Sequence, residues 1–303
     1  MDAATTLTDF PDKLGPVFVR DLRQGLRTQV FVWAFILIQA IALVTLLIDW
    51  GVVAGMGIAS AGIPLPSFFV GAMSILFSLI LPLTQFGALQ SELGRGRNIE
   101  LLLCSHLSRW QIVRGKLFVA CTLSGLLLIS LLPFVFLRYF IGGVELVESL
   151  SEVFSLFVSN ATMNAIVIGA SGFANYIGRS TVILFASIAH AITVATLPAV
   201  IGFRSTSPNP AIAYLAAAAG SIPFILLGLQ LGRSRLRIFE NPIDPPSSGI
   251  VLFLIFCTPI LHGIAIAAGG VTGSISVLVI IASLALFMDR GPGKRKQLKG
   301  AQP

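Results

Sequence analysis

Charged residues are scarce in this chain of 303 residues, at 11% of the total, whereas 55% of the residues are hydrophobic. Because a water-soluble domain carries about 25% charged residues, this composition excludes a water-soluble protein. Uncharged runs long enough to cross a bilayer recur along the sequence, and a spanning helix needs about 20 apolar residues for about 30 Å of hydrocarbon. The sequence therefore predicts an all-α, polytopic integral membrane protein.

Residues that hold metals or form disulfides are also few. Cys104, Cys121 and Cys257 show no pairing pattern, and the three histidines offer no ligand spacing for a metal. The phosphate-binding motif G-x-x-x-x-G-K-[ST] is missing, and no polar stretch is long enough for a nucleotide-binding domain. We expect no cofactor on this chain, and any ATP hydrolysis that drives it belongs to another polypeptide.

Eight apolar runs are predicted to span the membrane. Their limits are 29–48, 67–90, 117–137, 153–177, 181–203, 211–231, 249–268 and 272–288, with Gly269 and Gly270 forming a tight turn between the last two. These runs suggest three regions: an amphipathic segment over 1–28, a six-span core over 29–240, and a linker, two-span extension and basic tail over 241–303.

Basic residues are distributed unequally between the two ends of the predicted spans. All but two of the 20 Lys and Arg residues fall on one side, and the exceptions are Arg138 and Arg204. Because Lys and Arg are retained in the cytoplasm, both termini are expected to be cytoplasmic. This bias and the attraction of anionic lipid explain the net charge of +7, so nucleic acid is not an expected partner.

The segment before the first span has the pattern of an interfacial helix. From Leu14 to Arg27, apolar residues recur every four positions on one face, and Arg20, Arg23 and Arg27 cluster on the other. Pro16 suits the first turn of a helix. The alternative is that these arginines only anchor the first span as its positive flank.

A longer amphipathic segment, residues 92–116, lies between the second and third apolar runs. Asn98 is a good N-cap and Glu100 suits the first turn after it, so a short helix is predicted over 99–105, containing Leu101 and ending at Ser105. Ser108 and Gln111 then form an S-x-x-Q capping box, which predicts a second helix that includes Arg109 and continues into the next span.

This segment resembles the type 2 permeases of ATP-binding-cassette transporters. Those subunits share an acidic residue, a basic stretch with glycine, then G-T-x-E-x-L-L-x-x-P-L-S and I-x-x-G-K. The chain matches at 92–96, 99–103, 107–109 and 112–116, but Arg97-Asn98 replaces Gly-Thr and His106 replaces the proline. Residues 15–24 are similar to the elbow helix of such permeases, and 178–181 stand where the family has a turn between spans 4 and 5.

The resemblance implies a function and a set of partners. The chain would be the permease subunit of an exporter in the bacterial inner membrane, forming a path with a second permease subunit. Residues within 98–116 would contact a separate ATPase subunit that carries ATP and Mg²⁺. The coupling residues implied are Asn98, Glu100, Leu101, Ser105, Ser108 and Arg109.

Two other functions are compatible with the sequence. A membrane scaffold or assembly protein would have the same spans without a path. Residues 169–172 spell G-A-S-G, and His190 or His262 in later spans would make Ser171 a nucleophile of the rhomboid kind. Small residues at such positions are also ordinary devices of helix packing, which favours a structural role for this motif.

The fourth predicted span carries an unusual number of polar residues. Asn160, Asn164 and Asn175 are candidates for a translocation path or a subunit interface, or for hydrogen bonds between helices of one subunit. At its outer start, Glu145, Glu148 and Glu152 suggest a solvated acidic turn, and Arg138 an interfacial anchor.

Overall fold

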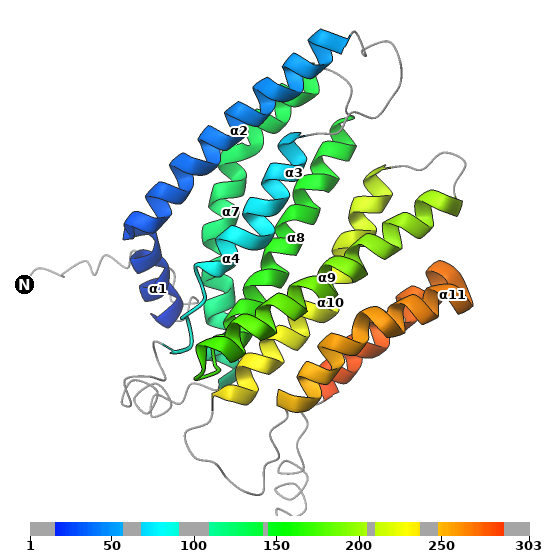
Figure 1. Cartoon of the computed structure of the whole chain (residues 1–303). Helices are drawn as coiled ribbons and strands as arrows, with labels where there is room; N and C mark the ends of the chain where they lie inside the picture. The colour runs from blue at the N-terminus through cyan, green and yellow to red at the C-terminus, as the bar shows by residue number, and fades with distance from the viewer. Residues whose placement is uncertain are drawn as a thin grey trace, which may run out of the picture.

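The computed structural model describes residues 16–56, 68–90, 109–141, 145–204, 210–236 and 248–287, and they form a bundle of helices (Figure 1). Six helices are long and apolar enough to cross a membrane, which confirms the all-α, membrane-spanning prediction. The helices are α1 (Pro16–Arg27), α2 (Gln29–Met56), α3 (Phe68–Ile75), η2 (Leu76–Ile80), α4 (Leu81–Leu83), α7 (Arg109–Ile141), α8 (Leu146–Ala170), α9 (Tyr176–Arg204), α10 (Pro210–Arg235) and α11 (Ser248–Phe287).

Helix α1 spans Pro16–Arg27, with Pro16 in its first turn as predicted, and ends where the chain bends sharply into α2 (Figure 1). Leu14, where the predicted helix starts, lies outside the described residues. The bend is at Thr28, whose hydroxyl donates to the Gly25 carbonyl over 2.6 Å and whose backbone N–H donates to the same oxygen. The helix packs against α7 and leaves Arg20, Arg23 and Arg27 exposed. A helix with an exposed basic face is therefore observed, and its position at a membrane interface stays a prediction.

The second predicted span is not one regular helix. After α3, the five residues of η2 form a π-helix, and α4 ends at Leu83. The chain then continues as turns over residues 84–89, held by backbone bonds such as Gln85 N–H to the Pro82 carbonyl. The expectation of one regular helix over 67–90 is corrected: the helix ends at Leu83, seven residues early. Pro82 cannot donate a backbone hydrogen bond to the preceding turn, and the π-helix lies directly before it.

Helix α8 forms the centre of the bundle and lies directly against α10. A Cβ atom on Gly228 would lie 2.6 Å from the Ala165 carbonyl carbon, and one on Gly169 would meet the Gly228 carbonyl oxygen. Together with Gly232 this is small-xxx-small packing on both helices. The helix also differs from the predicted limits of 153–177: it spans Leu146–Ala170, so its turn to α9 comes at residues 171–175.

Helix α11 is a hairpin. As a straight rod its 40 residues would be about 60 Å long, twice the thickness of the hydrocarbon. Gly270 has φ 62° and ψ −139°, a conformation open essentially to glycine alone, and there the chain folds back on itself. The two arms lie side by side (Figure 1), and His262 Nδ1 lies 3.3 Å from Ser274 Oγ across them. The predicted glycine turn between the last two spans is confirmed.

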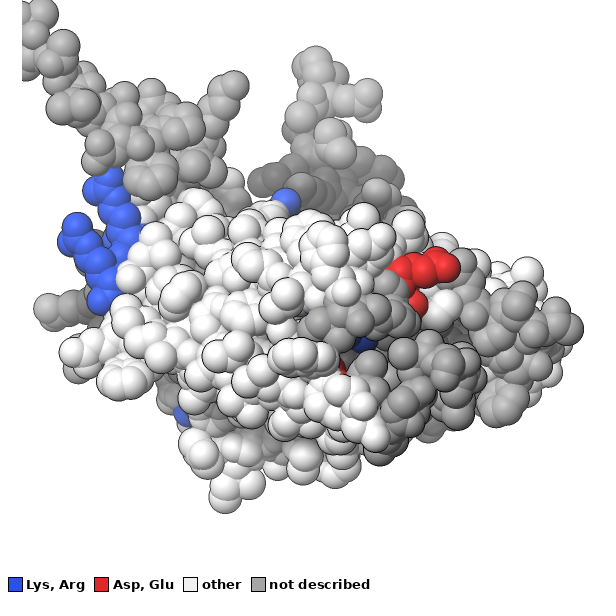
Figure 2. Space-filling view, turned by 90° about the horizontal axis from the view of Figure 1, so that it is seen from above, with Lys and Arg blue, Asp and Glu red and all other residues white. Residues whose placement is uncertain are grey.

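The two ends of the bundle differ in charge. Helix α1, the start of α7 and the end of α10 meet at the lower end in Figure 1, bringing together arginines such as Arg23, Arg109 and Arg233. Seen from above in Figure 2, the described surface is almost entirely uncharged, with a few charged groups near its rim. The basic side chains of α1, of the start of α7 and of the end of α10, which the sequence predicts on one face, thus lie toward one end.

Candidate functional site

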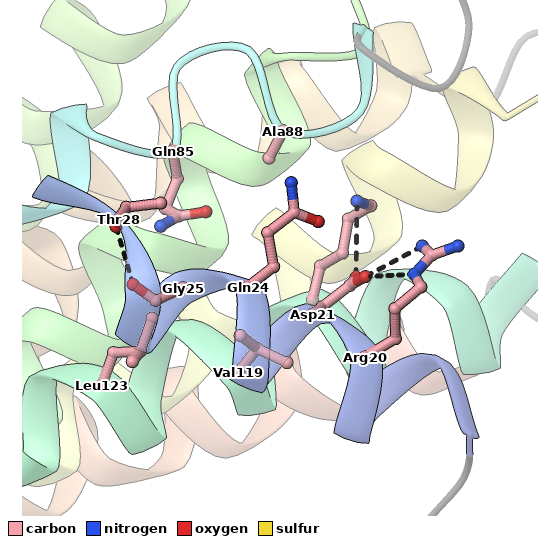
Figure 3. Close-up of a pocket in the computed structure, with 10 residues that line it drawn as sticks. Arg20, Asp21, Gln24, Gly25, Thr28, Gln85, Ala88, Val119 and Leu123 are labelled. Atoms are coloured by element: carbon pink, nitrogen blue, oxygen red, sulfur yellow. Dashed lines mark hydrogen bonds and ion pairs between the residues drawn. The ribbon is translucent and has the colours of Figure 1, made fainter. Parts of the chain in front are cut away.

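A cavity of about 520 Å³ opens between α1, the turn after α4 and α7 (Figure 3). We call it the entrance cavity. Gln24 extends from α1 toward the turn that carries Gln85 and Ala88 (Figure 3). The residues that line the entrance cavity are Arg20, Asp21, Gln24, Gly25, Thr28, Gln85, Ala88, Lys116, Val119 and Leu123.

The charged groups of the entrance cavity are joined through Asp21. Its Oδ1 accepts from Arg20 Nε over 2.9 Å and lies 2.8 Å from an Nη atom of the same arginine. Its Oδ2 lies 3.9 Å from Lys116 Nζ (Figure 3). The carboxylate is only 17% exposed, so it is screened little by water and holds the side chains of α1 and α7 together.

A second cavity, of about 260 Å³, continues from the first into the bundle. We call it the inner cavity. It shares Gly25, Thr28, Gln85 and Leu123 with the entrance cavity, and its other lining residues are Val30, Phe31, Ala34, Leu81, Thr84, Ala120, Ser124, Leu127 and Asn164. None of the described residues that line the inner cavity is charged, so the polarity of the site falls from its mouth inward.

The break in the second span borders both cavities. Leu81, Thr84 and Gln85 line the inner cavity, and Gln85 and Ala88 the entrance cavity. The turn after α4 therefore forms a wall that both cavities share.

The asparagines of the fourth span have three different environments. Asn160 is fully buried and donates from Nδ2 to the Phe77 carbonyl in η2 over 2.6 Å, which is a hydrogen bond between helices of one chain. Asn164 donates to Asn160 Oδ1 over 2.8 Å and also lines the inner cavity. Asn175 is not in α8 at all: it lies in the turn, where its Oδ1 accepts from the Ile177 backbone N–H. Of the three, Asn164 lines the inner cavity.

Most of the predicted coupling residues cannot be placed, because Asn98, Glu100, Leu101, Ser105 and Ser108 lie outside the described residues. Arg109 is exposed in the first turn of α7. The helix runs without a break from there through Lys116 into the span, as the capping box predicts. The end of the predicted coupling segment is thus rigidly joined to the wall of the entrance cavity.

Ser171 has a structural position. Its Oγ accepts from the Leu89 backbone N–H over 3.0 Å and donates to the Ile168 carbonyl over 2.7 Å, which ties the end of α8 to the turn after α4. Neither of the two histidines in the described ranges pairs with it. His190 Nε2 lies 2.9 Å from Ser221 Oγ, and His262 lies beside Ser274. The G-A-S-G motif therefore packs helices and caps a turn in this fold.

Arg179 was expected in a turn between spans 4 and 5, and that expectation is wrong. It lies in the first turn of α9, is 7% exposed, and stacks 5.1 Å from the centre of the Phe86 ring. Its guanidinium donates to the carbonyls of Phe86 and Ala174, each over 3.4 Å. The arginine thus links the irregular segment after α4 to the turn between α8 and α9.

Sequence reasoning missed Asp21 and Gln85 as members of a site. Asp21 has opposite charge to its neighbours on a basic helix, which was the available signal, but its partner Lys116 is 95 positions away. Gln85 lies within an uncharged run that resembles a plain span. Among the described residues, no group of three or more His, Cys, Asp or Glu side chains is arranged to hold a metal ion. Comparison of the chain with protein-family models, with curated proteins and with solved structures found no match.

Proposed function

We propose that the chain is the permease subunit of an ATP-driven exporter, working with a separate ATPase subunit and a second permease subunit. The observation that carries the proposal is the contact of 3.9 Å between Asp21 and Lys116. It joins the helix that resembles an elbow helix to the lysine that ends the I-x-x-G-K match. The two parts of the sequence that resemble such permeases therefore meet in space, at the mouth of a cavity.

A mechanical argument supports the same proposal. An ATPase that binds the segment 92–108 would move the start of α7, because this helix is continuous from Arg109 onward. Lys116 is two turns further along and touches Asp21 of α1. A displacement there changes the separation of α1 and α7, which both line the entrance cavity. ATP and Mg²⁺ remain on the ATPase, and both termini lie in the cytoplasm in this proposal.

The test is copurification of the full chain from its native membranes in mild detergent. We expect a polypeptide that binds ATP and hydrolyses it, in a fixed ratio to the chain. Glu100→Lys should leave expression normal and weaken the association, because a charge stranded at a subunit junction costs about 2–5 kcal/mol. That is a loss of affinity of about 30-fold or more.

Glu145→Lys is the matched control. It makes the same charge change on an exposed glutamate at the opposite end of the bundle, and association should be unchanged. Absence of any ATP-hydrolysing partner would contradict the proposal and favour a membrane scaffold. Equal association of both variants would remove Glu100 from the contact.

A further inference from the structure

The entrance and inner cavities adjoin along four shared lining residues and differ in chemistry. Arg20, Asp21 and Lys116 stand at the mouth. The deeper part is bordered by Phe31, Leu81 and Leu127, and no described residue around it carries a charge. A ligand that fills both parts needs a charged group at one end and an apolar chain at the other.

We propose that this space binds one anionic phospholipid. Its phosphate lies at the mouth beside the guanidinium of Arg20 and the ammonium of Lys116, and one acyl chain enters the inner cavity past Phe31 and Leu127. The proposal concerns the chain alone and does not depend on an ATPase, so it can hold or fail separately from the function proposed above.

The charges at the mouth favour a phosphate. Two of the three charged lining residues are cationic, and Arg and Lys are the side chains that most often bind phosphate oxygens. Asp21 holds the two cations on the same side of the cavity. The Arg20 side chain remains 58% exposed despite this contact, so a headgroup can reach it.

The location of the mouth favours a lipid as the source of that phosphate. Helix α1 has the composition of an interfacial helix, and Arg23 and Arg27 are exposed on it. Each basic residue near an anionic membrane surface contributes about 1 kcal/mol of attraction, which concentrates anionic lipid beside the cavity. The volume of the entrance cavity, about 520 Å³, is in the range of ligand sites, about 300–1,000 Å³, and the adjoining inner cavity has about 260 Å³.

The interior favours a chain over a compact solute. The inner cavity adjoins the entrance cavity along four shared residues, and its wall also includes the exposed Val30 and Thr84, so it opens at the surface of the bundle, where an acyl chain can enter. Asn164 lies at its inner border, but its amide already donates to Asn160. The polar groups inside are thus engaged within the protein, which suits an apolar occupant.

The binding test is calorimetric titration of the purified full chain, in maltoside micelles, with dioctanoyl-phosphatidylglycerol. Dioctanoyl-phosphatidylcholine and glycerol 3-phosphate are the comparison ligands: the first has no net charge and the second has no chain. We expect saturable binding of one phosphatidylglycerol per chain, with weaker binding of both comparison ligands.

Variants at the mouth of the entrance cavity distinguish binding of the headgroup at this site from a general attraction of anionic lipid to basic residues. Lys116→Gln should weaken phosphatidylglycerol binding about tenfold or more, the effect of losing one hydrogen bond between charged groups. Arg114→Gln is the matched control: it removes the same charge from the same helix, but Arg114 lies over the rings of Trp110 and Phe118 and does not line the cavity. Its affinity should equal that of the unmodified chain.

Variants of the interior test for the acyl chain. Ser124→Phe fills the inner cavity, and Leu126→Phe places the same ring on the exposed side of α7. Only the first should abolish the advantage of phosphatidylglycerol over glycerol 3-phosphate. Ala34→Leu fills the cavity from the opposite wall by a smaller volume, should Ser124→Phe fail to fold.

Each result decides the proposal. It stands if charge at the mouth and space in the interior both control phosphatidylglycerol binding. Equal binding of phosphatidylglycerol and phosphatidylcholine, or equal effects of Lys116→Gln and Arg114→Gln, would overturn the headgroup site. If glycerol 3-phosphate binds as tightly as the lipid, the site takes a soluble phosphate compound and the proposal is wrong.

Discussion

Arg138 of α7 and Glu152 of α8 form a buried ion pair, with Nη1 and Oε2 2.9 Å apart. Their side chains are 13% and 4% exposed, so neither charge is well solvated. The sequence favoured an interfacial anchor and a solvated acidic turn at these positions, and both interpretations are wrong for this pair. Two charges that would each be costly alone join α7 to α8 at the upper end of the bundle.

Replacing one member of this pair is expected to lower the free energy of unfolding more than replacing both. Arg138→Met or Glu152→Leu alone should lower the free energy of unfolding by about 3–5 kcal/mol, because a buried charge is left without its partner. The double variant should recover most of this loss. The measurement is denaturant unfolding in mixed micelles, with exposed Glu145→Gln as the neutral control. Additive effects of the two substitutions would show that the pair is not coupled.

Gly169→Ala should destabilise the bundle by about 1–3 kcal/mol, the usual cost of overpacking. The new methyl group would meet the Gly228 carbonyl, which is backbone and cannot swing aside. Gly71→Ala makes the same change inside α3, where nothing lies within 4 Å. It should be neutral or stabilise by up to about 1 kcal/mol. Thermal unfolding of both variants tests this, and equal melting temperatures would contradict the close α8–α10 contact.

Ser171→Ala should affect stability and not chemistry. The buried Leu89 backbone N–H loses its acceptor, at a cost of about 1–3 kcal/mol. Ser234→Ala is the control, since that hydroxyl only donates to the Leu231 carbonyl and leaves no donor unsatisfied when removed. ATP hydrolysis by the copurified complex, per folded chain, should be unchanged in both. Complete loss of activity at normal stability would instead indicate a nucleophile.

Cysteine labelling tests the expected orientation. In a chain whose three native cysteines are replaced by serine, Glu145→Cys should react with an impermeant maleimide in intact cells. Arg23→Cys, on α1 at the other end of the bundle, should react only after the membrane is opened. The reverse pattern would place the basic end outside and contradict the cytoplasmic termini.

The spans were predictable because uncharged length is a local property of the sequence. Pro16 and Gly270 also gave local signals, a fixed φ and an accessible positive φ, and both mark the ends or turns that were expected. The break after Leu83 was not predictable, since residues 84–89 remain uncharged and read as more of the same span.

The site itself was only half predictable. The elbow helix and the end of the I-x-x-G-K match were identified separately, but their contact through Asp21 depends on how α1 folds back at Thr28 onto α7. Similarly, Glu152 and Arg138 belong to different helices, and their pairing is a result of packing. The sequence shows which charged side chains are unfavourable in a membrane, whereas the tertiary fold determines which partner each of these charges has.

The backbone contact of α8 with α10 has a mechanical consequence. Where Gly169 and Gly228 meet, no side chain lies between the helices that could rotate to let them slide. We therefore expect the two helices to move together, because closely packed backbones have no side chains to rearrange between them. Relative motion is then expected in the elements on either side of them, which are α1, α2 and α7 on one side and the α11 hairpin on the other.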